Sequence, residues 1–177
     1  MLVAMFDARR RSPWWRAMLC PLAVLSFAWP AVAAQPQSIA QQVVGTWDVL
    51  SVTITSADGS TVDPFGPKPN GVIMLDADGR YANVLGRPDR PKIDADNRLA
   101  ITPEQLGATA KEFAANFGKW SVAATGTTIT LQFEGSLDPN NEGTAATYDL
   151  ALEGGGMTFS ITLPGERVEV VKYARAN

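Results

Sequence analysis

A Gly-x-Trp segment opens the β-rich part of this chain and constrains its fold more than any other feature. Residues 44–51 read Val-Gly-Thr-Trp-Asp-Val-Leu-Ser, at the start of a long stretch rich in Val, Ile, Thr and aromatic residues. A Gly-x-Trp in this position indicates a small closed barrel. A barrel of about eight strands is wide enough either to be packed by its own side chains or to hold one small ligand. The segment therefore predicts an architecture but identifies no ligand.

Strand-like segments follow one another to the end of the chain. They alternate apolar and polar residues, as in Ile129/Leu131/Phe133, and turn residues separate them at regular spacing. Asp78-Gly79 between two apolar runs is a strong hairpin signal. The pattern indicates an all-β protein, an antiparallel sandwich or barrel of about eight strands rather than a parallel sheet. The expected strands are residues 44–55, 71–75, 80–85, 119–122, 127–134, 144–152, 157–163 and 166–175.

Two proline-rich segments interrupt this pattern. Residues 61–70 contain three prolines and cannot form a regular ladder, so they predict an ordered loop at the barrel rim. The second segment is residues 87–91. In it, Arg87 and Arg90 lie on either side of Asp89 and could bind the carboxylate of a ligand at the barrel mouth through paired hydrogen bonds. The alternative, which we favour, is an internal Arg–Asp pair that stiffens the loop.

One α-helix is expected near residues 103–117. Thr102 can cap its start, Pro103 suits the first helical position, and Gln105 completes a capping box. Gly118 is a good terminator. The helix should lie against the outside or one mouth of the barrel, where it either closes the core or forms a lid over a cavity. Apolar residues at steps of four, three and four define its packing face: Leu106, Ala110, Phe113 and Phe117.

The first 34 residues predict a cleavable export signal. A basic stretch precedes an apolar run at residues 17–29, and residues 31–34 form a small-residue cleavage site. The apolar run is too short for a membrane span of roughly 20 residues, although an uncleaved anchor is the alternative. We expect a signal peptide (1–34), a short lead (35–43) and a barrel domain (44–177). The mature protein is then periplasmic or secreted, and the general export route fits better than the twin-arginine route.

Charge and cysteine content exclude several classes of partner. The chain has 15 basic and 18 acidic residues, and removal of the leader leaves 11 and 17, a net charge of −6. An acidic domain without a basic stripe is a poor candidate for nucleic-acid binding. Cys20, the only cysteine, lies in the leader after Leu19, which is too large for lipoprotein cleavage. We expect a mature chain without a disulfide, thiol nucleophile, lipid anchor or membrane span.

The absence of histidine limits the chemistry. Neither a Ser-His-Asp nor a Cys-His constellation can be assembled, and a zinc site would need carboxylates alone. Residues 76–79 and 94–97 resemble the start of calcium loops, but their twelfth positions are Arg87 and Gln105 rather than glutamate, so both are interpreted as turns. We predict no metal, no cofactor and no catalytic residue.

One pair of carboxylates remains as a candidate for acid–base catalysis. It consists of Glu134 with either Asp138 or Asp149, because such catalysis needs two acidic side chains that face one cavity. A solvated or salt-bridged Glu134 is the alternative.

Several ordered segments together resemble the lipocalin-like domain family, a group of mostly uncharacterised bacterial and fungal proteins with calycin-type small β-barrels. They are residues 45–51, 64–67, 78–81, 87–91, 117–120, 134–139 and 173–175. The resemblance implies an up-and-down barrel of about eight strands, closed at one end by Trp47 with Arg175 packed across it. The family tends to have a histidine in the strand before the Glu-x-Ser-Leu-x-Pro segment, whereas residues 129–134 contain none.

These observations predict an exported protein that binds a small apolar or amphipathic molecule inside the barrel. One alternative is a cavity enzyme that isomerises or cyclises an apolar substrate, with Glu134, Tyr81 or Tyr148 as acid or base. Another is a cell-envelope interaction module with a packed barrel. An apolar cavity of about 300 Å³ would favour binding, and a pKa-shifted carboxylate within it would favour chemistry. The candidate ligand-binding residues, which could equally fill the interior, are Tyr81, Leu85, Arg87, Trp120, Phe133, Tyr148 and Phe159.

Overall fold

The computed structural model describes residues 37–93 and 98–176. The predicted signal peptide (1–34) and the turn at residues 94–97 lie outside these residues. None of the helices in the described segments has the length and apolar character needed to cross a membrane.

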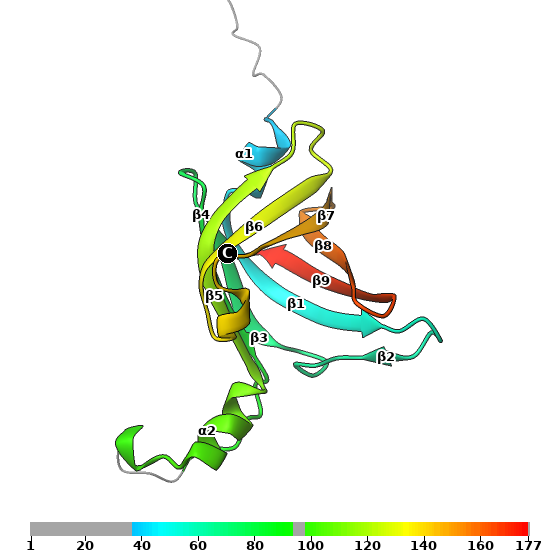
Figure 1. The fold of residues 1–177 in the computed structure, drawn as a ribbon. Helices are drawn as coiled ribbons and strands as arrows, with labels where there is room; N and C mark the ends of the chain where they lie inside the picture. The colour runs from blue at the N-terminus through cyan, green and yellow to red at the C-terminus, as the bar shows by residue number, and fades with distance from the viewer. Residues whose placement is uncertain (1–36, 94–97, 177) are drawn as a thin grey trace, which may run out of the picture. The chain divides into compact units, whose positions relative to one another are not determined.

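The described residues form a closed antiparallel β-barrel (Figure 1). Eight strands pair in the order β1-β3-β4-β5-β6-β7-β8-β9, and β1 pairs with β9 to close the sheet. The short β2 pairs in antiparallel fashion with the last two residues of β1. This confirms the predicted fold class. The strands are β1 (Gly45–Thr55), β2 (Thr61–Val62), β3 (Asn70–Leu75), β4 (Arg80–Gly86), β5 (Phe113–Val122), β6 (Thr128–Ser136), β7 (Ala145–Glu153), β8 (Gly156–Leu163) and β9 (Arg167–Arg175).

The turns follow the chemistry that the sequence predicts. Gly79 adopts a left-handed φ of 79° in the β3–β4 hairpin, and the Asp76 carboxylate accepts a hydrogen bond from the Asp78 amide. The loop predicted at residues 61–70 is shorter in the structure, because Thr61 and Val62 form β2 and pair with Thr55 and Ile54, and Asn70 begins β3. The ladder stops before the three prolines, which cannot donate to it.

Alternation of side chains separates an apolar interior from a polar exterior. In β6, Ile129, Leu131 and Phe133 are buried, whereas Gln132 and Glu134 point outward. All strands except β2 and β5 contribute fully buried residues to the core, and β5 adds only partly buried side chains. The buried residues are Trp47, Val49, Val52, Ile73, Leu75, Tyr81, Leu85, Ile129, Leu131, Phe133, Leu150, Met157, Phe159, Val171 and Tyr173, joined by Val43.

The predicted lead contains a helix, α1 (Ile39–Val43), that the sequence analysis did not anticipate. The Ser38 hydroxyl accepts from the Gln41 amide, and the Gln41 side chain accepts from the Ser38 amide, which makes a complete capping box. Val43 is fully buried in the core. The helix therefore packs on one end of the barrel (Figure 1).

The second helix, α2 (Pro103–Ala110), is shorter than predicted. Its start is confirmed, since Thr102 and Gln105 exchange the two capping hydrogen bonds. Its end was placed too late, because residues 113–117 belong to β5 and pair with residues 86–82 of β4. A run with helical spacing thus forms a strand, since ladder pairing along the barrel outweighs a weak local periodicity.

The predicted role of α2 is wrong as well. None of its residues is buried, and Leu106 keeps 44% of its surface exposed. Gly118, predicted to end the helix, instead lies at a bulge in β5. The helix neither closes the core nor contributes a residue to the wall of the barrel cavity.

Candidate functional site

One end of the barrel is closed by Trp47. Its indole is 2% exposed, and its Nε1 donates a 2.8 Å hydrogen bond to the Val43 carbonyl at the end of α1. The last carbonyls of a helix have no partner within the helix, so this bond satisfies one of them. The indole therefore joins the first strand to the helix that covers it.

Arg175 lies across the same tryptophan. Its guanidinium carbon stands 4.2 Å from the centre of the Trp47 ring, and its Nη atoms donate to the carbonyls of Gln42 and Val44. A cation at a helix C-terminus is favourable, because the helix dipole leaves negative partial charge there. Gly45 is the residue that permits this contact: with φ at 135°, a Cβ on it would lie 2.6 Å from the arginine Nη1.

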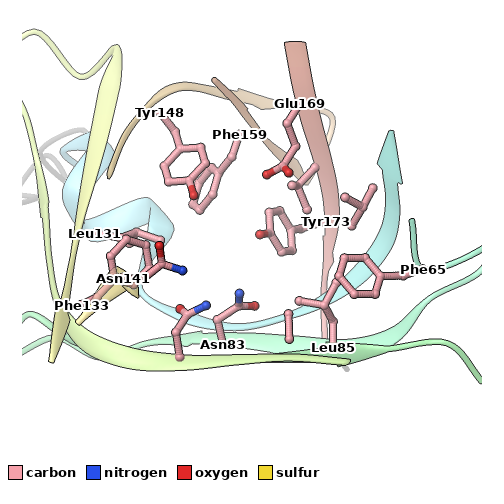
Figure 2. Close-up of a pocket in the computed structure, with 14 residues that line it drawn as sticks. Phe65, Asn83, Leu85, Leu131, Phe133, Asn141, Tyr148, Phe159, Glu169 and Tyr173 are labelled. Atoms are coloured by element: carbon pink, nitrogen blue, oxygen red, sulfur yellow. The ribbon is translucent and has the colours of Figure 1, made fainter. Parts of the chain in front are cut away.

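A cavity of about 190 Å³ occupies the other half of the barrel (Figure 2). Phe65 in its wall comes from the loop between β2 and β3, and Asn141 comes from the short 3-10 helix η2 (Pro139–Asn141) between β6 and β7, at the end opposite α1. Its wall is mixed, with apolar side chains interrupted by a few polar ones. The full wall is Val52, Phe65, Asn83, Leu85, Ala114, Asn116, Leu131, Phe133, Asn141, Tyr148, Phe159, Glu169, Val171 and Tyr173.

Four of the seven sequence-predicted ligand-binding residues line this cavity. They are Leu85, Phe133, Tyr148 and Phe159, which come from β4, β6, β7 and β8. Tyr148 and Phe159 lie side by side in Figure 2, with ring centres 5.7 Å apart. These side chains come from four different strands and meet in the wall of one cavity.

The other three predicted residues do not line it. Tyr81 is buried elsewhere in the core, and its hydroxyl has no hydrogen-bond partner among the described residues. The Trp120 indole donates to the Asp76 carbonyl at 2.9 Å. Arg87 lies 3.7 Å from the Asp89 carboxylate, which is the internal pair that the sequence analysis favoured over an anion clamp.

The polar part of the wall was not predicted from the sequence. Glu169 and Tyr173 are on β9, and Asn83 and Asn116 are opposite one another in the β4–β5 ladder. Glu169 and Tyr173 could have been predicted, because residues 169, 171 and 173 alternate along one strand. If Val171 belongs to the core, all three side chains point to the inner face. Asn141 ends the 3-10 helix η2 between β6 and β7, where no strand periodicity exists.

Glu134 does not face the cavity. It alternates outward on β6 and forms an ion pair with Arg80 at 2.7 Å and a longer one with Lys119 at 3.9 Å. Neither Asp138 nor Asp149 belongs to the wall of the cavity. The salt-bridged alternative for Glu134 describes the structure, and the predicted carboxylate pair does not exist.

Burial shifts the titration of the groups in the wall. It raises the pKa of the Glu169 carboxyl above its usual range. Burial, reinforced by the charge of Glu169, raises the pKa of Tyr148 to about 12. The pKa of Tyr173 is raised still further, mainly by burial and additionally by Tyr148 and Glu169. Both phenols are therefore neutral over the physiological range, and Glu169 is the one charged group that the wall contains.

Residues 44–172 match a family model described as a lipocalin-like domain. The chain belongs to the lipocalin-like domain family. Among curated proteins, none matches this lipocalin-like chain.

Solved structures resemble this lipocalin-like domain at low sequence identity. A lipocalin-like protein from Bacteroides uniformis is 12% identical, with a TM-score of 0.39, over 76% of this chain and 99% of its own. A mutant of the fluorescent protein UnaG is 11% identical with a TM-score of 0.35, over 77% and 97%. A redesigned β-barrel, mFAP1, bound to DFHBI, is 18% identical with a TM-score of 0.37, over 78% and 100%.

The lipocalin-like cavity offers hydrogen bonding and one titratable carboxylate. The described residues contain no group of three or more Cys, Asp or Glu side chains placed to hold a metal ion. The aromatic rings of Tyr148, Phe159 and Tyr173 form one side, and Asn83 lies across from them in Figure 2. The arrangement can hold a small molecule between an apolar face and polar groups.

Proposed function

We propose that this lipocalin-like domain is exported and binds a small amphipathic molecule in its barrel cavity. The observation that carries the proposal is the cavity itself, about 190 Å³ of unfilled space in a barrel whose other half is packed around Trp47. Binding sites combine mostly apolar walls with a few placed polar groups, and this wall has that composition.

The volume limits the size of the ligand. The cavity is smaller than the criterion of about 300 Å³ set from the sequence, and its wall is not purely apolar. An engineered apolar cavity of about 150 Å³ holds benzene. We therefore expect a molecule with one or two rings, or a short chain, inside the barrel.

An enzymatic role is the second candidate, and Glu169 is the observation that favours it. Burial raises the pKa of this carboxyl, and a buried carboxyl with a raised pKa is a candidate for acid–base catalysis. Loss of turnover in Glu169→Gln with unchanged substrate affinity would support this role. Binding alone remains the simpler proposal, because the wall holds only one carboxylate and the neighbouring phenols keep their protons.

The interaction module is supported less well. Phe117, half exposed, forms an apolar patch with Val84 and Leu137 on the outside of β4–β6, as such a module requires. A packed interior was the other half of that hypothesis, and the cavity contradicts it.

Export and binding are testable on the protein from its natural source. N-terminal sequencing of the mature protein should begin at Gln35. Native mass spectrometry of the same material should detect an added small molecule that is lost on denaturation. A mature chain that begins at Met1 would contradict export, and protein that never carries or takes up a small molecule would contradict binding.

Adjacent alanines of β5 provide a matched pair of variants. Ala114 lines the cavity, whereas Ala115 points to the outer groove between β4 and β6. Ala114→Trp should fill the cavity and abolish ligand retention, and Ala115→Trp should leave retention unchanged. Equal loss in both variants would place the binding site elsewhere.

A further inference from the structure

The cavity has one charge, and this charge is negative. Glu169 is the single carboxylic acid in the wall, and no arginine or lysine of the described residues joins it there. No hydrogen bond or ion pair connects its carboxylate to another described residue. Burying a carboxylate that has no hydrogen-bond donor or cation beside it is energetically unfavourable. It is stabilised when a ligand supplies a positive charge.

The aromatic side of the cavity lies next to this carboxylate. Figure 2 shows Glu169 beside Tyr173 and Phe159, and the Phe159 and Tyr173 rings are 5.1 Å apart in an edge-to-face arrangement. Tyr148 extends the run on the other side of Phe159. Aromatic faces attract cations as well as apolar rings. A ligand whose ring meets this run would bring an attached head group to Glu169.

The opposite side adds further hydrogen-bond acceptors. Asn83 and Asn116 pair across β4 and β5, and their buried amide oxygens accept no hydrogen bond from the described residues. Unsatisfied acceptors of this kind favour ligands that carry N–H or O–H groups. The unpaired asparagine oxygens and the Glu169 carboxylate therefore favour a ligand with donor groups, and only Glu169 selects for charge.

We propose that the ligand is a small cationic amine, one or two rings in size, with its ammonium group on Glu169 and its ring against Tyr148, Phe159 and Tyr173. This inference rests on the proposed function and specifies the ligand class of the same cavity. An aliphatic amine is protonated at neutral pH, as the ordinary pKa of about 10.4 for lysine illustrates. Its N–H donors match the acceptor oxygens of the Glu169 carboxylate.

An anionic ligand is disfavoured by the same geometry. Arg87, the residue that could have bound a carboxylate, lies outside the wall and pairs with Asp89. A ligand carboxylate would meet Glu169 without any compensating cation. The cavity should therefore discriminate by charge between molecules of equal shape.

Three probes that share one ring system test this selectivity. They are 2-naphthylmethylamine, 2-naphthalenemethanol and 2-naphthoate, whose dissociation constants are measured by NMR titration at pH 7. The amine should bind the full mature protein about tenfold or more tightly than the alcohol, since hydrogen bonds to charged groups are the stronger ones. The carboxylate should bind most weakly. Glu169→Gln should abolish the preference for the amine and leave the affinity for the alcohol within about twofold.

A control and separate readouts distinguish the possible failures. Glu134→Gln removes the same charge from the outer face and should keep the full preference for the amine. Equal affinities for amine and alcohol, or a preference that survives in Glu169→Gln, would overturn the ligand class while cavity binding stands. If no probe binds, the amine proposal is wrong. Native mass spectrometry then decides separately whether the cavity holds another molecule. Circular dichroism confirms that each variant is folded.

Discussion

Gly45, Trp47 and Arg175 are in contact with one another, and together they close one end of the barrel. The indole hydrogen bond to Val43 fixes α1, and the guanidinium covers the ring while it binds the carbonyls of Gln42 and Val44. Gly45 leaves the space through which the arginine passes. A Gly-x-Trp segment thus marks a closed barrel end because these contacts need a missing Cβ and a large ring two residues later.

Trp47→Ala should destabilise the protein by about 3–5 kcal/mol, the usual cost of removing a large buried aromatic side chain. Trp47→Phe should cost less, because it keeps a ring beneath Arg175 and loses mainly the hydrogen bond to Val43, worth about 1 kcal/mol. Urea unfolding followed by far-UV circular dichroism measures both values. Wild-type stability in Trp47→Ala would show that the indole does not hold the closed end.

Glu169→Gln should stabilise the protein at neutral pH. Because burial raises the pKa of the Glu169 carboxyl, the folded state holds its proton at pH values where the unfolded chain, with an ordinary pKa of about 4.3, has lost it. Wild-type stability therefore falls as the pH rises from the ordinary pKa through the raised one, and the variant lacks this fall.

The measurement is a comparison of unfolding free energies between about pH 3.5 and 8, a range that spans the ordinary glutamate pKa. The two proteins should agree at the acidic end and diverge above it, with the variant the more stable. Glu134→Gln is the matched control, since its exposed ion pair with Arg80 contributes about 0–1 kcal/mol and its loss cannot stabilise. A variant less stable than the wild type at pH 7 would mean that Glu169 already has a stabilising partner.

At the scale of elements, the strands were predictable because alternation reports directly which face is buried. The β3–β4 hairpin and β6 to β9 follow the sequence pattern closely. The β5 strand did not, because Phe113 and Phe117 also fit helical spacing and a capping box lies just before them. Only pairing with β4, which is a tertiary property, decides between the two. The same limit applies to the site, since inward-facing Glu169 and Asn83 resemble solvent-facing residues in a single sequence.

Gly118→Ala tests the β5 assignment. A Cβ at residue 118 would lie 1.9 Å from the Gln132 carbonyl oxygen of β6, so the two strands would have to separate. We expect a loss of about 3 kcal/mol or more, the upper range for overpacked sites. Gly107→Ala is the control: residue 107 lies within α2 with no atom near its Cβ position, and alanine there should stabilise by about 0.5–1 kcal/mol. Equal effects from both substitutions would contradict the strand.

At the scale of the whole molecule, the barrel is closed by strand pairing, and its interior consists of a packed end and a half that contains the cavity. The first and last strands pair along their length, so the sheet has no free edge between them. The end sealed by α1, Trp47 and Arg175 is packed, and the cavity occupies the half where the connections between strands supply Phe65 and Asn141. The sequence predicted the closed barrel but left open whether the interior is filled, because the answer depends on volumes that side chains from all eight strands determine together.

Arg175→Ala should separate these two halves experimentally. Its hydrogen bonds join residues 131 and 133 positions apart, yet they are exposed to solvent. We therefore expect a loss of only about 1–2 kcal/mol for these bonds and the ring contact with Trp47 together. Hydrogen exchange should accelerate at the amides of α1 and the start of β1, while affinity of the cavity for a bound probe should stay unchanged. Arg167→Ala, at the other end of β9 where the side chain contacts the Pro164 carbonyl, should leave exchange at α1 at wild-type rates. Loss of probe binding in Arg175→Ala would show that the closed end and the cavity are one cooperative unit rather than two.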